Sequence, residues 1–111
     1  MTYEEIAAIV KEMATALKCK AAYHHFNKAQ QAPFLVYFYP ENDDFKADGK
    51  NYVKITSLRF EFYTNKKSLS AEKIIESILQ NHSLTYSKLE TWISSENLFQ
   101  ISYQAEVIIN A

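Results

Sequence analysis

The sequence is poor in glycine, cysteine, proline and arginine. Its 111 residues include one glycine (Gly49), one cysteine (Cys19), two prolines and one arginine. A single glycine excludes the dinucleotide-binding fingerprint and the P-loop, because both need several glycines to bring the backbone against phosphate. A single cysteine excludes an internal disulfide and every multi-cysteine zinc or iron–sulfur site, and it favours a reducing compartment.

Charge and hydropathy exclude two further classes of protein. Lys and Arg number 12 against 13 Asp and Glu, so the net charge of -1 gives no global attraction to nucleic acid or to an anionic membrane. No apolar run approaches the roughly 20 residues that cross a bilayer. With 48% hydrophobic residues, the chain is able to bury one real core. We therefore expect a single intracellular domain over residues 1–111, with no membrane or nucleic-acid partner.

Hydrophobic periodicity predicts the fold class. Helical spacing of apolar residues extends over about 3–18 and 70–81. Alternation with a period of two predicts five strands, over about 22–26, 34–39, 52–64, 84–93 and 98–109. The order α-β-β-β-α-β-β predicts an α+β domain, with a mostly antiparallel sheet and two helices packed on one face.

Several local features refine this prediction. Thr2 and Glu5 fit a capping box, and Ser70 is the expected N-cap of the second helix, with Leu69 as its hydrophobic staple. Residues 41–50 form the longest loop signal, which ends in an Asp-Gly pair suited to a turn with positive φ. In the strand over 52–64 the alternation slips near Ser57, which predicts a bulge or a change of buried face there.

No residue pattern predicts catalysis or metal binding. His24 and His25 are adjacent on a predicted strand, so their side chains should point to opposite faces and not share one metal ion. Asp43, Asp44 and Asp48 lack the alternate spacing of a calcium loop. We therefore expect a protein that is not an enzyme and has no catalytic, cofactor-binding or metal-binding residues.

The aromatic residues leave two functions open. Eight tyrosines exceed what one small core is able to hide, and Tyr is enriched at protein interfaces because it joins a large apolar body to a polar tip. In the alternative, a single-strand nucleic-acid-binding module, strand aromatics stack unpaired bases, although the charge balance disfavours it. The candidates for stacking are Tyr37, Tyr39, Tyr52, Phe60, Phe62 and Tyr103.

Two segments carry a resemblance to a known family. One runs from Pro33-Phe34-Leu35-Val36-Tyr37 through Asp44-Phe45-Lys46-Ala47-Asp48-Gly49 and Tyr52 to Phe60-Glu61-Phe62-Tyr63-Thr64-Asn65-Lys66-Lys67. The other is Thr91-Trp92-Ile93-Ser94-Ser95-Glu96-Asn97-Leu98-Phe99-Gln100-Ile101-Ser102-Tyr103. Together, over roughly residues 33–109, they resemble tail-terminator, or tail-completion, proteins of siphophages and prophages of Gram-positive bacteria.

This resemblance implies a non-enzymatic structural protein of a bacteriophage. Terminators of this kind have an α+β fold and form a hexameric ring that caps the tail tube. They bind the major tail tube protein on one face and a head-completion protein on the other. The expected localisation is the host cytoplasm during assembly and then the tail–neck region of the virion. Another neck or minor tail protein of the same region remains an alternative.

In a ring of this kind each subunit contacts its neighbour through two different patches. The residues that we expect to make protein contacts lie in or beside the predicted loop and after the long strand. They are Asp44, Phe45, Asp48, Lys50, Tyr52, Lys66 and Lys67.

Overall fold

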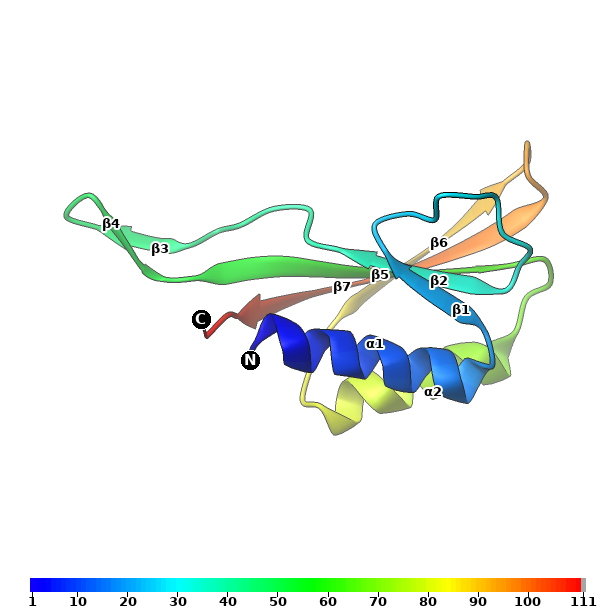
Figure 1. Cartoon of the computed structure of the whole chain (residues 1–111), viewed down its shortest axis with the longest axis horizontal. Coiled ribbons are helices and arrows are strands. Elements are labelled where there is room, and N and C mark those ends of the chain that lie inside the picture. Colours follow the sequence, from blue (N-terminus) through cyan, green and yellow to red (C-terminus); the bar gives the residue numbers. More distant parts are fainter. Residues whose placement is uncertain (111) are drawn as a thin grey trace.

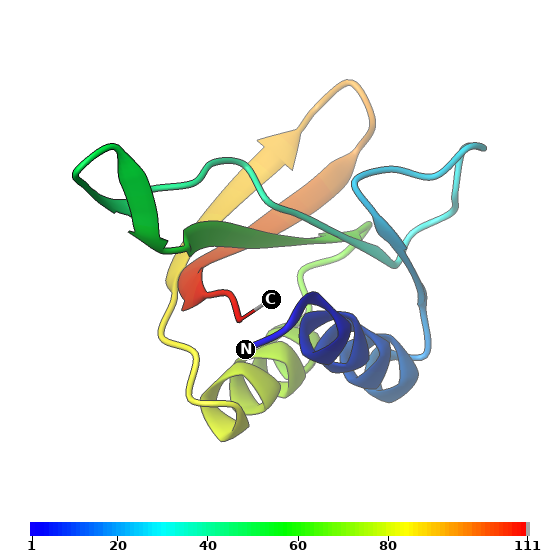
Figure 2. The ribbon, with the colours of Figure 1, turned by 60° about the vertical axis from the view of Figure 1, so that its left-hand side comes forward.

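The computed structural model describes residues 1–110, apart from the side chains of Asn51 and Tyr52. Helices α1 (Tyr3–Leu17) and α2 (Leu69–Asn81) cover one face of a five-stranded sheet (Figures 1 and 2), which confirms the predicted α+β class. The strand order is β1-β2-β5-β7-β6, and only the β1–β2 pair is parallel. These strands are β1 (Lys20–Tyr23), β2 (Phe34–Phe38), β5 (Ile55–Thr64), β6 (Ser87–Ile93) and β7 (Leu98–Ile108).

A small hairpin extends from the end of the main sheet. Its strands β3 (Phe45–Ala47) and β4 (Lys50–Val53) pair with each other and project away from the helices (Figure 1). The predicted loop over 41–50 therefore contains β3, and the strand predicted over 52–64 is two strands that meet at Lys54. The alternation slips because β4 pairs within the hairpin whereas β5 belongs to the main sheet.

Of the bulge and the change of buried face that were predicted as alternatives near Ser57, the bulge is not present. Strand β5 pairs with β7 in one unbroken register from Ile55↔Ile108 to Thr64↔Phe99. Ser57 is nevertheless buried, and its backbone N–H donates to the carbonyl of Glu41 at 2.8 Å, so the chain before the hairpin continues the ladder beside β5. The irregularity that the sequence indicates lies three residues earlier, at Lys54.

The core lies between the two helices and the face of the sheet that they cover. Burial of each large apolar side chain contributes about 1.5–3 kcal/mol. In β7 the inward positions follow the predicted alternation, from Ile101 to Val107. The main contributors are Ile6, Ile9, Val10 and Met13 of α1, Ile75, Ile78 and Leu79 of α2, and Leu35, Leu58, Phe60, Phe62, Ile101, Tyr103 and Val107 of the sheet.

The structure confirms the predicted N-cap of α1 and corrects the predicted N-cap of α2. The hydroxyl oxygen of Thr2 accepts from the backbone N–H of Glu5 at 3.1 Å, as predicted for the start of α1. At α2 the N-cap is Ser68, which accepts from the N–H of Ala71, and not Ser70. Leu69 is 72% exposed, so the predicted staple does not form. Over the described residues, neither helix is both long enough and apolar enough to cross a membrane.

A network of charged side chains joins α2 to β6 and to the turn after β5. The buried carboxylate of Glu72 lies 2.6 Å from Nζ of Lys67 and 2.6 Å from Nζ of Lys88. Lys88 also contacts Glu76 at 2.8 Å, and the hydroxyl of Tyr103 donates to the same Glu76 oxygen at 2.9 Å. Burial alone would raise the pKa of Glu72, but hydrogen bonds from Lys67 and Lys88 outweigh burial and hold this pKa below its ordinary value of 4.5.

We expect Glu72→Gln to lower the free energy of unfolding by about 1–2 kcal/mol at neutral pH, because it removes the charge from a hydrogen-bonded ion pair. Since the pKa of Glu72 is lower in the folded than in the unfolded state, its contribution is complete above pH 4.5 and is lost as the pH falls through the folded pKa. Urea unfolding at neutral and acidic pH measures both effects. The variant should lose less stability on acidification than the wild type, and an equal loss would contradict the account. Glu106→Gln, at an exposed position of β7, is the control and should behave as the wild type.

Candidate protein-interaction surfaces

The residues predicted to make protein contacts lie at the two ends of β5. Asp44, Phe45, Asp48 and Lys50 belong to the hairpin segment before β5, whereas Lys66 and Lys67 follow its last residue. A ten-residue strand spans about 33 Å, so these residues do not form one site. The side chain of Tyr52 lies outside the described part of the chain. We refer to residues 43–54 as the arm.

The arm is fastened to the main sheet at its base. The backbone N–H of Asp43 donates to the carbonyl of Ile55 at 2.8 Å, and the N–H of Ile55 donates to Oδ1 of Asp44 at 3.0 Å. The half-buried Asp44 therefore accepts the last hydrogen bond from β5 before the arm leaves the sheet. This hydrogen bond supports the arm, and the intermolecular contact that the sequence suggested for Asp44 stays a prediction.

The far end of the arm has the turn that the sequence predicts. Asp48 (φ 50°) and Gly49 (φ 74°) both adopt left-handed backbone conformations, as a tight two-residue hairpin requires. Phe45 is 58% exposed, so it does not fold back into the core of its own domain. A two-stranded hairpin is marginally stable in water by itself. An exposed aromatic ring on such a hairpin is typical of a surface that binds another protein.

Lys67 has partners within the chain. Its Nζ lies 2.6 Å from Glu72 and also contacts Glu90, so it ties the turn after β5 to α2 and β6. The hydrogen bonds that Lys67 donates to Glu72 and Glu90 raise the pKa of Lys67 above its ordinary value. Lys66 is exposed to solvent. Lys67 thus has ion-pair partners within the subunit, and the contacts of Lys66 and Lys67 with another protein stay predictions.

Four tyrosines gather where α1 meets strands β1 and β2. The rings of Tyr23 and Tyr37 are 5.2 Å apart, as are those of Tyr3 and Tyr39, and both pairs are edge-to-face. Burial raises the pKa of Tyr39 above its ordinary value. Half of Tyr23 remains exposed, so this cluster is a second aromatic surface of the molecule.

The rings that were candidates for stacking bases are largely unavailable. Phe60, Phe62 and Tyr103 are buried under the helices, and Tyr37 and Tyr39 pack against the core. The side chain of Tyr52 is not described. Apart from that ring, the sheet does not present the predicted aromatic platform to solvent, which weakens the nucleic-acid alternative.

The histidine pair is arranged differently from the prediction. Strand β1 ends at Tyr23, and His24 has a positive φ of 67°, so the alternation of side chains stops there. As a result, Nδ1 of His24 and Nδ1 of His25 are only 3.1 Å apart, instead of on opposite faces. Among the described residues, no group of three His, Cys, Asp or Glu side chains is arranged to hold a metal ion.

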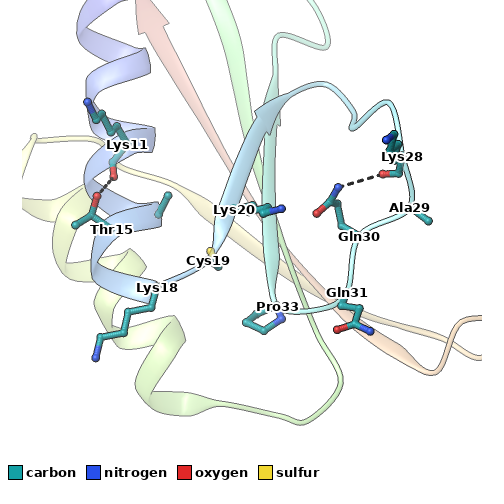
Figure 3. Close-up of a pocket in the computed structure, with 11 residues that line it drawn as sticks. Lys11, Thr15, Lys18, Cys19, Lys20, Lys28, Ala29, Gln30, Gln31 and Pro33 are labelled. Atoms are coloured by element: carbon teal, nitrogen blue, oxygen red, sulfur yellow. Dashed lines mark hydrogen bonds between the residues drawn. The ribbon is translucent and has the colours of Figure 1, made fainter.

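A basic basin lies between the C-terminal half of α1 and the loop that precedes β2 (Figure 3). It has a volume of about 840 Å³, and four exposed lysines line it: Lys11, Lys18, Lys20 and Lys28. None of them forms an ion pair with another described residue. The sequence analysis missed this surface, although one signal was present: residues 13–40 contain no Asp or Glu.

We expect Gly49→Ala to loosen the arm without destabilising the domain. No atom lies within 4 Å of the position that the new Cβ would occupy, so the cost is backbone strain of about 1 kcal/mol. Native-state hydrogen exchange should show faster exchange of the arm amides, while the urea unfolding midpoint stays unchanged. Asp48→Asn, which tolerates the left-handed conformation, should leave the exchange of the arm as in the wild type. A comparable fall in global stability would show that the arm is part of the cooperative core.

No protein-family model matches this chain, and no match is found among curated proteins either. The function of these surfaces is therefore inferred from their own geometry and chemistry, together with the motifs of the sequence.

Proposed function

We propose that this chain is a non-enzymatic assembly protein of a bacteriophage, a tail terminator that forms a ring on the finished tail tube. In this proposal the subunits form a hexamer, and the ring binds the major tail tube protein on one side and a head-completion protein on the other. The protein acts in the host cytoplasm during assembly and is then part of the tail–neck region. The class of protein comes from the motifs over residues 33–109.

The arm is the observation that carries the proposal. It places the exposed Phe45 at one end of a molecule that measures 49 × 29 × 24 Å. An apolar ring held away from the core on a marginal hairpin gains stability when a partner covers it. Ring assembly needs surfaces of this kind, because each subunit has to grip its neighbour and the tube through parts that protrude.

The alternatives within the same class use the same surfaces. Another neck or minor tail protein would also bind neighbouring subunits through the arm, but it would have a different position in the virion. The gene neighbourhood distinguishes the class: genes for a major tail protein and a tape-measure protein beside this one support the proposal. Neighbouring genes that encode only metabolic enzymes would contradict it.

The direct experiment measures self-association and binding of the tail tube protein. We expect native mass spectrometry at rising concentration to show oligomers, either of the chain alone or together with the major tail tube protein from the same gene cluster. A strict monomer that also fails to bind that tube protein would contradict the proposal.

Phe45→Ala should weaken this association at least about tenfold, because the covered aromatic ring is lost, and it should leave the unfolding midpoint unchanged. Leu69→Ala is the matched control, since it removes an apolar side chain that is even more exposed but lies outside the arm. Sedimentation velocity of the two variants and the wild type measures the effect. Equal weakening by both substitutions would show that the arm has no special part in assembly.

A further inference from the structure

A groove lies on the face of the sheet that the helices leave uncovered. Residues of β2 and β5 line it, together with the loop after β1 and the turn between β6 and β7, and its volume is about 390 Å³. Leu35 and Tyr37 of β2 pack toward the core, so Val36, which lies between them and lines the groove, is on the opposite face. The groove adjoins the basic basin at residues 28–30, which line both.

Three aromatic rings line the groove, and none of them was among the candidates for stacking bases. The rings of Phe34 and Tyr63 are nearly parallel, with centroids 4.8 Å apart and planes 20° apart. The ring of Phe26 stands almost perpendicular to that of Phe34, at 84°, with centroids 5.6 Å apart. All three side chains are half-buried. Half-buried rings of this kind suit a cation, because the face of an aromatic ring carries negative charge.

A carboxylate without an ion-pair partner lies beside these rings. The half-buried Glu61 accepts a hydrogen bond from the hydroxyl of Tyr63 at 3.1 Å, and this hydroxyl accepts from Nε2 of Gln100 at 2.7 Å. Among the described residues, no basic side chain forms an ion pair with Glu61 or with Glu96, the second carboxylate of the groove. Of the residues that line the groove, only Lys28 is a lysine or arginine, so the carboxylates outnumber it. Because a partly buried charge costs free energy until it is paired, a cation from another molecule would stabilise Glu61.

We propose that the groove binds an arginine side chain of a partner protein, with its guanidinium paired to Glu61 and stacked on the rings of Phe26 and Phe34. A guanidinium suits this site better than an ammonium group, because its planar fork matches a carboxylate and its face stacks on aromatic rings. The only arginine of this chain, Arg59, donates both Nε and Nη2 hydrogen bonds to Gln104, so the arginine comes from a different protein. A nucleic acid is a weaker candidate, because the carboxylates would repel its phosphates.

A titration with a small arginine probe tests the site. Nα-acetyl-arginine amide, added to the isotope-labelled protein and followed by NMR, should shift the backbone amides of groove residues such as Glu61 and Tyr63, and the shifts should saturate. Nα-acetyl-citrulline amide has nearly the same shape without the charge, so it should bind at least about tenfold more weakly. Nα-acetyl-lysine amide should bind about threefold more weakly. If either of these probes binds as tightly as the arginine probe, the inference is overturned.

Two substitutions separate the charge from the rings. Glu61→Gln keeps an acceptor for the hydroxyl of Tyr63 but removes the charge, and it should raise the dissociation constant of the arginine probe about tenfold. Phe26→Leu keeps an apolar side chain but removes the ring, and it should raise this constant about threefold. Glu106→Gln is the matched control, because Glu106 is an exposed carboxylate on the same face of the sheet and does not line the groove. Thermal unfolding checks that each variant is folded, and an unchanged dissociation constant in folded Glu61→Gln would contradict the inference.

Two further results would assign the groove differently. If a labelled single-stranded oligonucleotide binds the wild type and loses affinity in Phe26→Leu, while the arginine probe does not bind, the groove is a nucleic-acid site and the inference is overturned. If the probe shifts amides around Lys11 and Lys18 of the basin instead of those of the groove, the inference is overturned as well. Neither result bears on self-association or on binding of the tail tube protein, so failure of this inference leaves the proposed function to its own experiment.

Discussion

The pairing of β5 with β7 is the interaction on which the rest of the structure depends. These strands share one register over ten residue pairs and lie at the centre of the sheet. Their inward side chains, such as Phe60 and Tyr103, fill the core under both helices. The same strand β5 begins at the base of the arm and ends at the turn whose Lys67 binds Glu72. Strand β5 thus contributes side chains to the core, determines the direction of the arm and positions the turn that places Lys67 beside the buried Glu72.

This arrangement gives the molecule two different ends. The helices cover one face of the sheet and form the core with it. The protruding parts of the molecule lie at the ends of its long axis (Figure 1). The arm, which has three aspartates and three lysines, lies at one end, and the basic basin lies toward the other (Figure 1). Such polarity suits assembly by a repeated contact between unlike patches, because every subunit then offers the next one the same free surface. This polarity is compatible with the proposed ring, and the proposed tail-terminator class rests on the sequence motifs alone.

The sequence predicted those features that depend on local pattern. The alternation from Ile101 to Val107 indicated an inward face, and Asp48-Gly49 indicated the turn that the arm has. The arm itself was missed because its strands are short and charged. The contact between Nδ1 of His24 and Nδ1 of His25 depends on the positive φ of His24, and no neighbouring residue in the sequence predicts this backbone conformation. The intrachain partners of Lys67 come from α2 and β6, far along the chain, so the sequence did not indicate them. The basin likewise arises only where the end of α1 meets the loop before β2.

The most direct test of the account asks whether the arm is covered when the protein assembles. Phe45 of the arm is 58% exposed in the single subunit. Hydrogen exchange of the backbone amides, measured at low and at high protein concentration and with the major tail tube protein added, reports which segments become covered. The account predicts that the arm amides exchange more slowly in the assembled state. If oligomers or the complex form and the arm amides exchange at an unchanged rate, the arm has no part in assembly.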